Sequence, residues 1–242
     1  MTSVRVAMLA PMRPELAPLV KKIPLHRVEG DPAYSHIGTI GEVEVVAAIT
    51  GIGTRPATEV AERVLGAVDI DHLMVVGIAG GVGPTVEIGD LTVPEIVTAE
   101  AGGPEDRATP LGITPRGTIV TSDQFGYEHD EIRQFIQRGV IGVDMETASI
   151  AAVCAKHDTP WTAFRGISDR GDDDTVDKRV LELGGADGSL NVLALIRYLL
   201  PAPWRLRHLA NLARGAKLAT NAAADAAIAA CANVRPKSAS RP

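Results

Sequence analysis

Aromatic residues are scarce in this chain of 242 residues, at 3% of the total. Proteins that bind single-stranded nucleic acid stack the bases on aromatic side chains, so the scarcity argues against that class. Two cysteines, Cys154 and Cys231, cannot make a disulfide framework or a four-ligand zinc site. No run of about 18 apolar residues is present, which argues against a transmembrane helix. The first residues also lack the features of a secretory signal, and we therefore expect a cytoplasmic protein.

Acidic residues dominate most of the chain, but not its end. Apolar residues make up 45%, which is a globular composition, and the net charge is −6. Residues 201–242 carry seven Lys or Arg and one acid, so the first 200 residues hold 17 basic and 29 acidic residues. A body with a net charge of −12 would repel nucleic acid, and we expect no nucleic-acid partner.

Short β-branched runs alternate with helical patterns along the chain. This alternation predicts an α/β fold, with a central mixed β-sheet flanked by helices. Strands are expected at 4–10, 72–80, 90–99 and 161–169 among others, and helices are expected at 55–68 and 189–200. The polar stretch 101–116 is predicted to be a loop.

The composition changes after residues 201–204, and we predict one domain over 1–200 followed by a basic, Ala-rich helical extension over 201–242. Leu206, Leu209, Leu212 and Ala213 recur at helical spacing. A helix of this length needs a surface on which to bury that stripe, so we expect it to dock on the body or on a neighbouring subunit. The less favoured alternative is that the basic helix lies on an anionic membrane, with Trp204 at the interface.

Carboxylates follow the ends of three different predicted strands. Glu15 comes after the first strand, Asp144 and Glu146 lie at a strand-to-helix junction, and Asp169 ends the strand 161–169. Each has an ordinary explanation, since acids complement a helix N-terminus and Asp favours turns. Open α/β sheets nevertheless bind ligands at the carboxyl ends of their strands. Three carboxylates gathered there can supply general acid and base roles around one substrate.

No cofactor or metal motif is evident. Gly77, Gly80, Gly81 and Gly83 follow a strand in VVGIAGGVGP, but their spacing matches neither a dinucleotide fingerprint nor a P-loop. We predict a simple turn there. The acids after Asp169 lack the alternating spacing of a calcium loop. We expect neither a cofactor nor a metal.

Five segments, taken in order, resemble the purine nucleoside phosphorylase/uridine phosphorylase superfamily, nearest to the 5′-methylthioadenosine/S-adenosylhomocysteine nucleosidases. They are VAMLAPMRPEL, VVGIAGGVGPTVEIGDLTVP, VTSDQF, VDMETASIAAVC and PWTAFRGISD. The resemblance covers most of residues 4–200, the predicted catalytic domain. It implies a nucleosidase that hydrolyses the N-glycosidic bond of a purine nucleoside or 5′-thioether nucleoside, commonly as a homodimer.

The resemblance also implies roles for individual residues. Glu15 matches the Glu that orients the attacking water, and Asp169 matches the acid that protonates N7 of the leaving purine. Glu146 matches the Glu that binds the ribose hydroxyls, with Met145 packing under the sugar. Phe125 and the backbone of Gly126 lie beside the base, and the predicted substrate-binding set is completed by Ile78, Gly80 and Ser168.

The two catalytic roles need different ionisation states. Asp169 must hold a proton, so its pKa has to rise well above the usual value of about 3.9, while Glu15 must ionise to act as a base. Two alternatives stay open. One is a phosphorylase that releases ribose 1-phosphate, for which Arg13 and Arg55 could hold phosphate, although the strand before the glycines has no arginine. The other is a weakly catalytic nucleoside-binding module, to which the bulky Ile78 and the short 101–116 segment point.

Overall fold

The computed structural model describes residues 4–30, 33–124, 127–170 and 205–237. The strands are β1 (Arg5–Ala10), β2 (His26–Arg27), β3 (His36–Ile40), β4 (Val43–Ile49), β5 (His72–Gly81), β6 (Leu91–Thr92), β7 (Ile96–Ala99), β8 (Asp106–Arg107), β9 (Thr118–Thr121), β10 (Val140–Asp144) and β11 (Trp161–Arg170). The helices are α1 (Arg13–Lys22), α2 (Thr54–Ala67), α3 (His129–Gln137), α4 (Thr147–Lys156), α6 (Arg205–Ala230) and the 3-10 helix η2 (Cys231–Asn233).

Strand β5 joins two halves of one mixed sheet. The strand order is β2-β3-β4-β1-β5-β10-β9-β7-β8, and β11 pairs with both β5 and β6. Strand β5 runs parallel to β1 and β11, and its last residues, Gly80 and Gly81, pair antiparallel with β10. The predicted fold class is therefore confirmed. The carboxyl ends of β1, β5 and β11 meet the end of β10 at this junction.

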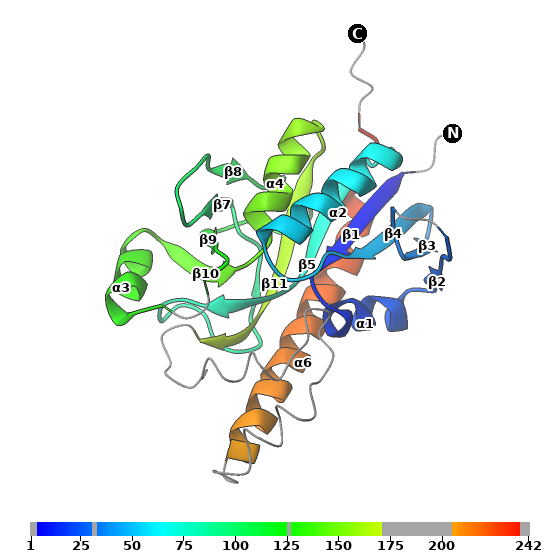
Figure 1. Ribbon diagram of the computed structural model, residues 1–242. Helices are drawn as coiled ribbons and strands as arrows, with labels where there is room; N and C mark the ends of the chain where they lie inside the picture. The colour runs from blue at the N-terminus through cyan, green and yellow to red at the C-terminus, as the bar shows by residue number, and fades with distance from the viewer. Residues whose placement is uncertain (1–3, 31–32, 125–126, 171–204, 238–242) are drawn as a thin grey trace.

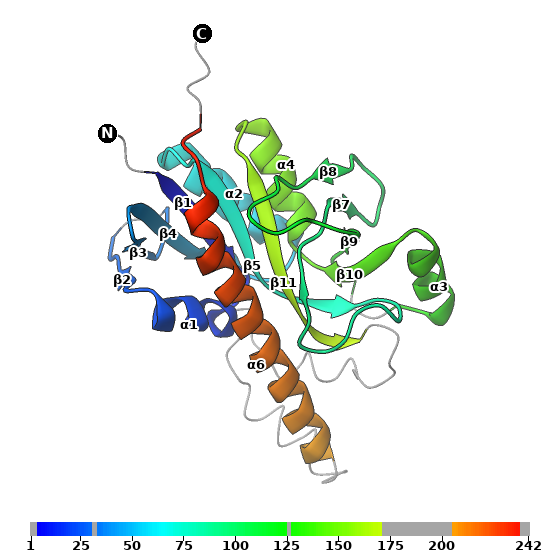
Figure 2. The same cartoon turned by 180° about the vertical axis from the view of Figure 1, so that it is seen from behind.

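Both faces of the sheet are covered, as the apolar strands require. Along β1, Val6, Met8 and Ala10 pack in one core cluster, while Ala7 and Leu9 pack in the other. Helices α2 and α4 cover one face (Figure 1). Helices α1 and α6 cover the opposite face (Figure 2).

The predicted C-terminal helix is present as α6, which crosses β11 and β5 (Figure 2). Its Ala219, Ala223 and Ala227 are fully buried at helical spacing. A Cβ atom on Gly166 of β11 would lie 2.1 Å from the carbonyl oxygen of Ala219. Small residues on both elements thus bring helix and strand backbones into contact, which explains why this helix is rich in alanine.

Other expectations about the chain end differ in their outcome. The structure does not describe the side chains of Leu206, Leu209 and Leu212, so the predicted burial of this stripe stays a prediction for them. Ala213, the fourth residue of the stripe, is exposed. The predicted helix 189–200 also falls outside the described residues, and the boundary between domain and extension stays a prediction. None of the helices in the described ranges has the length and apolarity needed to cross a membrane.

Two local expectations need correction. The segment 101–116 is not all loop, because β8 pairs antiparallel with β7. The strand expected at 90–99 is divided into β6 and β7 around Pro94. Proline has no N–H to donate to a neighbouring strand, which explains the interruption.

Gly166→Ala is expected to destabilise the fold by more than about 3 kcal/mol, because the added methyl group collides with the backbone of α6 rather than with a movable side chain. Gly66→Ala is the matched control. Gly66 lies in α2 with open space around its Cα, so alanine there should stabilise by roughly 0.5–1 kcal/mol. Denaturant unfolding of both variants measures the difference, and equal stabilities would contradict the proposed backbone contact.

Candidate active site

Glu15 is buried in the first turn of α1, next to Pro14 and just beyond β1. Its Oε1 accepts a hydrogen bond of 2.8 Å from the backbone N–H of Ile78, and its Oε2 is buried with no hydrogen-bond partner among the residues that the structure describes. Burial raises the pKa of Glu15 to about 8, with nearby Arg165 opposing the shift and Glu146 adding to it. Glu15 therefore holds a proton in most molecules at neutral pH when the site is empty.

Arg165 lies in the middle of β11 and is completely buried. Its Nη2 lies 2.8 Å from Asp144 Oδ2 and 3.2 Å from Glu146 Oε2, and it also donates to Thr147 Oγ1 at 2.9 Å. Burial opposes the charge, but the surrounding carboxylates of Asp144, Glu146 and Glu15 raise its pKa, so it stays a cation. Within the described part of the chain, its Nη1 is buried without a partner. One arginine thus pairs with two carboxylates, Asp144 and Glu146, and lies near a third, Glu15.

Glu146 is held from two sides at the start of α4. Its Oε1 accepts a hydrogen bond of 3.1 Å from the N–H of Gly53, and its Oε2 faces Arg165. Burial raises the pKa of Glu146, while Arg165 works against that shift. Met145 is partly buried beside it, between β10 and α4. The carboxylate is therefore fixed in direction before any ligand arrives.

The glycines of β5 make room for these groups. A Cβ atom on Gly77 would lie 2.3 Å from Glu15 Oε1 and 2.7 Å from Arg165 Nη1. The prediction of a turn was wrong for most of these glycines, because β5 continues through Gly81. Of these four glycines, only Gly83 has a positive φ, of 80°. Gly77 is required by the close approach of two side chains, not by backbone conformation.

Asp169 lies near the end of β11, beside Gly80. Its Oδ2 is 3.5 Å from the position of a Cβ on Gly80, and the hydroxyl of Ser168 donates to its Oδ1. Burial raises the pKa of Asp169, although the Ser168 hydrogen bond works in the opposite direction. This is the direction that a proton donor requires. Gly80 is three residues beyond Gly77, so the acid lies roughly 10 Å further along β5 than Glu15.

Comparison with known proteins identifies the family. The sequence profile of the Phosphorylase superfamily matches residues 5–112 and 105–197. The chain belongs to this superfamily. A 5′-methylthioadenosine/S-adenosylhomocysteine nucleosidase of Maridesulfovibrio salexigens is 26% identical over 231 residues, which cover 81% of this chain and 100% of that relative. An aminodeoxyfutalosine nucleosidase of Helicobacter pylori is 24% identical over 206 residues, covering 70% and 87%.

Solved structures agree on the fold of this superfamily member. A crystal structure of Helicobacter pylori 5′-methylthioadenosine/S-adenosylhomocysteine nucleosidase matches with a TM-score of 0.73 at 16% identity. The match covers 97% of this chain and 100% of that one. The resemblance noted from the five sequence segments is thereby confirmed.

The predicted residues fall into two groups in this superfamily member. Glu15, Ile78 and Glu146 gather around Arg165, while Ser168 and Gly80 accompany Asp169. Phe125 and Gly126 lie outside the described residues. Among the described residues, no group of three or more His, Cys, Asp or Glu side chains is placed to hold a metal ion.

Arg165 is the site residue that the sequence reasoning missed. It is the one charged residue of this strand before Asp169, and a charge inside a buried strand needs partners of opposite sign. That isolated charge was the available signal. Asp144, which the sequence explains as a helix-dipole residue, is one of those partners.

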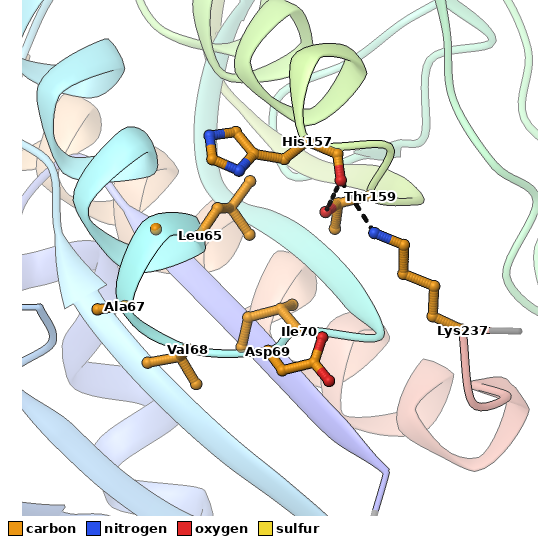
Figure 3. Close-up of a pocket in the computed structure, with 9 residues that line it drawn as sticks. Leu65, Ala67, Val68, Asp69, Ile70, His157, Thr159 and Lys237 are labelled. Carbon is orange, nitrogen blue, oxygen red and sulfur yellow. Dashed lines mark hydrogen bonds between the residues drawn. The ribbon is translucent and has the colours of Figure 1, made fainter. Parts of the chain in front are cut away.

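A pocket of about 350 Å³ lies near the amino ends of β5 and β11, away from these residues. It is lined by the end of α2 with Asp69 and Ile70 before β5, and by His157 and Thr159 before β11 (Figure 3). Lys237 also lines it and donates from Nζ to the carbonyl of His157 at 2.9 Å. None of the predicted site residues lines it, because they lie at the carboxyl ends of the same strands.

Proposed function

We propose that the chain is a nucleosidase that hydrolyses the N-glycosidic bond of a purine nucleoside or a 5′-thioether nucleoside. The observation that carries this proposal is the buried group of Glu15, Asp144 and Glu146 around Arg165, with the proton-holding Asp169 further along β5. Breaking such a bond places positive charge on the ribose and negative charge on the departing base. The carboxylates near Arg165 can stabilise the positive charge on the ribose, and the proton on Asp169 can neutralise the negative charge on the base.

At the sugar, Glu146 is proposed to accept hydrogen bonds from the ribose hydroxyls. The N–H of Gly53 and the guanidinium of Arg165 already hold the carboxylate in place, so little rotational freedom is lost on binding. Met145, partly buried next to it, is proposed to pack under the sugar ring.

The attacking water is proposed to bind between Glu15 and Arg165. Glu15 Oε2 and Arg165 Nη1 are both buried without partners, and buried polar atoms of this kind are usually satisfied by water or ligand. The absence of a side chain on Gly77 allows Glu15 and Arg165 to approach this strand so closely. A water accepting from Nη1 and donating to an ionised Glu15 would be oriented for attack, and Glu15 would take its proton.

At the base, Asp169 is proposed to protonate N7 as the glycosidic bond breaks. The hydrogen bond from Ser168 fixes Oδ1 and leaves Oδ2 to carry the proton. Phe125 and the backbone of Gly126 are proposed to lie beside the purine, and Ile78 and Gly80 complete the wall along β5.

Water is favoured over phosphate as the acceptor because the buried group is anionic. Its arginine, Arg165, is already directed at Asp144 and Glu146. Arg13 and Arg55, the candidates for holding phosphate, are both exposed, and Arg55 pairs with Glu59 on the surface of α2. A phosphate dianion would therefore meet mainly negative charge.

Incubation with a panel of nucleosides, with and without phosphate, tests the proposal. Free ribose, or free 5′-thioribose, formed at the same rate in both conditions is expected. Ribose 1-phosphate formed only with phosphate would establish a phosphorylase instead. Binding of nucleosides without any product would establish a binding module.

Glu146→Gln is expected to reduce the preference for ribonucleosides over 2′-deoxynucleosides, because the variant loses the charged acceptor for the sugar hydroxyl. The loss corresponds to roughly 1–3 kcal/mol on the ribose substrate. Competitive assays of kcat/KM on the two sugars measure it, with Glu59→Gln on the surface as the control. An unchanged preference would contradict the ribose-binding role.

The assembly and its location are part of the same proposal. We propose a cytoplasmic homodimer that takes a small nucleoside as substrate, on the strength of the sequence resemblance. Light scattering on the purified protein would detect the dimer, and a monomeric mass at working concentrations would refute it.

A further inference from the structure

Helix α2 begins without a cap of its own. Its N-cap residue, Gly53, has a φ of 104° and no side chain. The first N–H groups of a helix have no partner within the helix and need acceptors from elsewhere. Asp123 lies 69 residues further along the chain, in the loop after β9, and its carboxylate serves as the acceptor here. Its Oδ1 accepts a hydrogen bond from the Thr54 N–H at 2.8 Å, and its Oδ2 accepts one from the Thr54 hydroxyl at 2.6 Å.

The adjacent N–H serves the candidate site. Gly53 donates from its backbone to Glu146 Oε1 at 3.1 Å. The successive N–H groups of Gly53 and Thr54 therefore donate hydrogen bonds to two carboxylates from different parts of the chain, Glu146 and Asp123. The fit is close, since a Cβ on Gly53 would lie 3.1 Å from Asp123 Oδ1.

Asp123 is itself held in place by the residues before it. The Ser122 N–H donates to the Asp144 carbonyl at 2.9 Å, and Thr121 Oγ1 donates to Asp144 Oδ1 at 2.6 Å. Asp144 in turn pairs with Arg165. The position of Asp123 is thus tied to the buried charged group, although Asp123 is exposed.

We infer that Asp123 and Thr54 form a positioning pair, which fixes the Gly53 N–H against Glu146 and so sets the direction of that carboxylate. The inference rests on the proposed function for its kinetic consequence. Both residues act through Gly53 and are not catalytic. Without the pair, the 51–54 turn is free to move and Glu146 retains Arg165 alone on its other oxygen. The carboxylate then meets the ribose in the right orientation less often, which raises KM before it changes kcat.

Three variants and a control test the pair. Asp123→Ala removes both acceptors, Thr54→Val removes the hydroxyl, and Thr54→Ser restores a hydroxyl. Glu59→Gln removes an exposed carboxylate from the same helix without touching this junction. The first readout is kcat and KM on ribonucleosides and 2′-deoxynucleosides. The second is amide hydrogen exchange over residues 51–55 in the unliganded protein, which needs no activity.

Asp123→Ala is expected to raise KM for the ribonucleoside about five-fold or more, to reduce the preference over the deoxynucleoside, and to accelerate exchange over 51–55. Thr54→Val should do the same less strongly, and the double variant should be no worse than Asp123→Ala. Thr54→Ser and Glu59→Gln should behave like the wild-type protein.

Unchanged exchange over 51–55 in Asp123→Ala would overturn the inference. So would an equal loss on both sugars, because it would mean a general structural role. If the wild-type protein cleaves no nucleoside, the proposed function fails, and the exchange experiment alone then decides whether the pair fixes this turn.

Discussion

Glu15→Gln is expected to lower kcat/KM for nucleoside hydrolysis by about 10²- to 10⁴-fold, since an amide cannot take a proton from the attacking water. The substitution keeps the shape of the side chain and an oxygen that can accept from the Ile78 N–H. The fold should therefore survive. Steady-state assays on the purified variant measure the loss, and activity close to that of the wild-type protein would refute the role of Glu15.

The stability of Glu15→Gln should depend on pH differently from that of the wild-type protein. Below the ordinary pKa of 4.5, Glu15 is protonated both folded and unfolded. Between that value and about 8, the unfolded state releases the proton while the folded state keeps it, so the free energy of unfolding falls as the pH rises. Glutamine has no proton to release. We therefore expect the melting temperature of Glu15→Gln relative to wild type to increase from pH 5 to pH 9.

A control separates this effect from general changes of charge. Glu59→Gln removes an exposed carboxylate and should track the wild-type protein across the whole range. The activity profile offers a second check: kcat/KM of the wild-type protein should rise with pH toward about 8, as Glu15 ionises. If the melting temperatures of the wild-type protein and Glu15→Gln changed in parallel with pH, Glu15 would ionise as an ordinary carboxyl group.

Asp169→Asn is expected to reduce cleavage of purine nucleosides by about 10²- to 10⁴-fold while leaving the fold intact. An amide can accept the hydrogen bond from Ser168, but it cannot give a proton to the departing base. The deficit should shrink for a riboside with a p-nitrophenolate leaving group, whose departure needs no proton. Comparing the two substrates on both proteins measures this, and an equal deficit on both would contradict the role of Asp169 as an acid.

Ser168→Ala serves as the companion to that variant. Activity should fall at high pH, where Asp169 loses the proton that it donates. The Ser168 hydroxyl lowers the pKa of Asp169, so removing the hydroxyl should raise that pKa further and move this fall in activity to higher pH. The sign follows because a donor to the carboxylate favours the ionised form. A shift in the opposite direction would mean that another group controls the fall.

Much of the site could be predicted because strand ends converge. Glu15 and Glu146 follow the end of a strand and Asp169 lies near the end of another, and such ends meet at one side of a sheet, so the chain order alone places all three on that side. Arg165 could not be placed in the same way. It lies inside a strand, and its partner Asp144 is brought near by the antiparallel pairing of β10 with the end of β5. The same is true of Gly77, whose need for space arises from side chains 62 and 88 residues away.

The fold was predicted well where hydrophobic periodicity is strong and less well where small residues decide the packing. Helices α2 and α4 carry apolar faces that indicate burial directly. Helix α6 was predicted to be helical, but its depth in the fold depends on contacts of alanine with Gly166. Because alanine and glycine add little hydrophobic surface, hydrophobic periodicity does not reveal that depth.

The central position of β5 has a consequence for how the protein acquires activity during its synthesis. Its neighbours, β1 and β11, come from segments far apart in the chain, and α6, which covers them, follows both. Glu15 leaves the ribosome long before Arg165, so the two cannot meet until β11 has emerged. Before β11 joins the sheet, the carboxylates of Glu15, Asp144 and Glu146 have no Arg165 beside them. The buried charged group is therefore complete only after β11 is in place and α6 covers it.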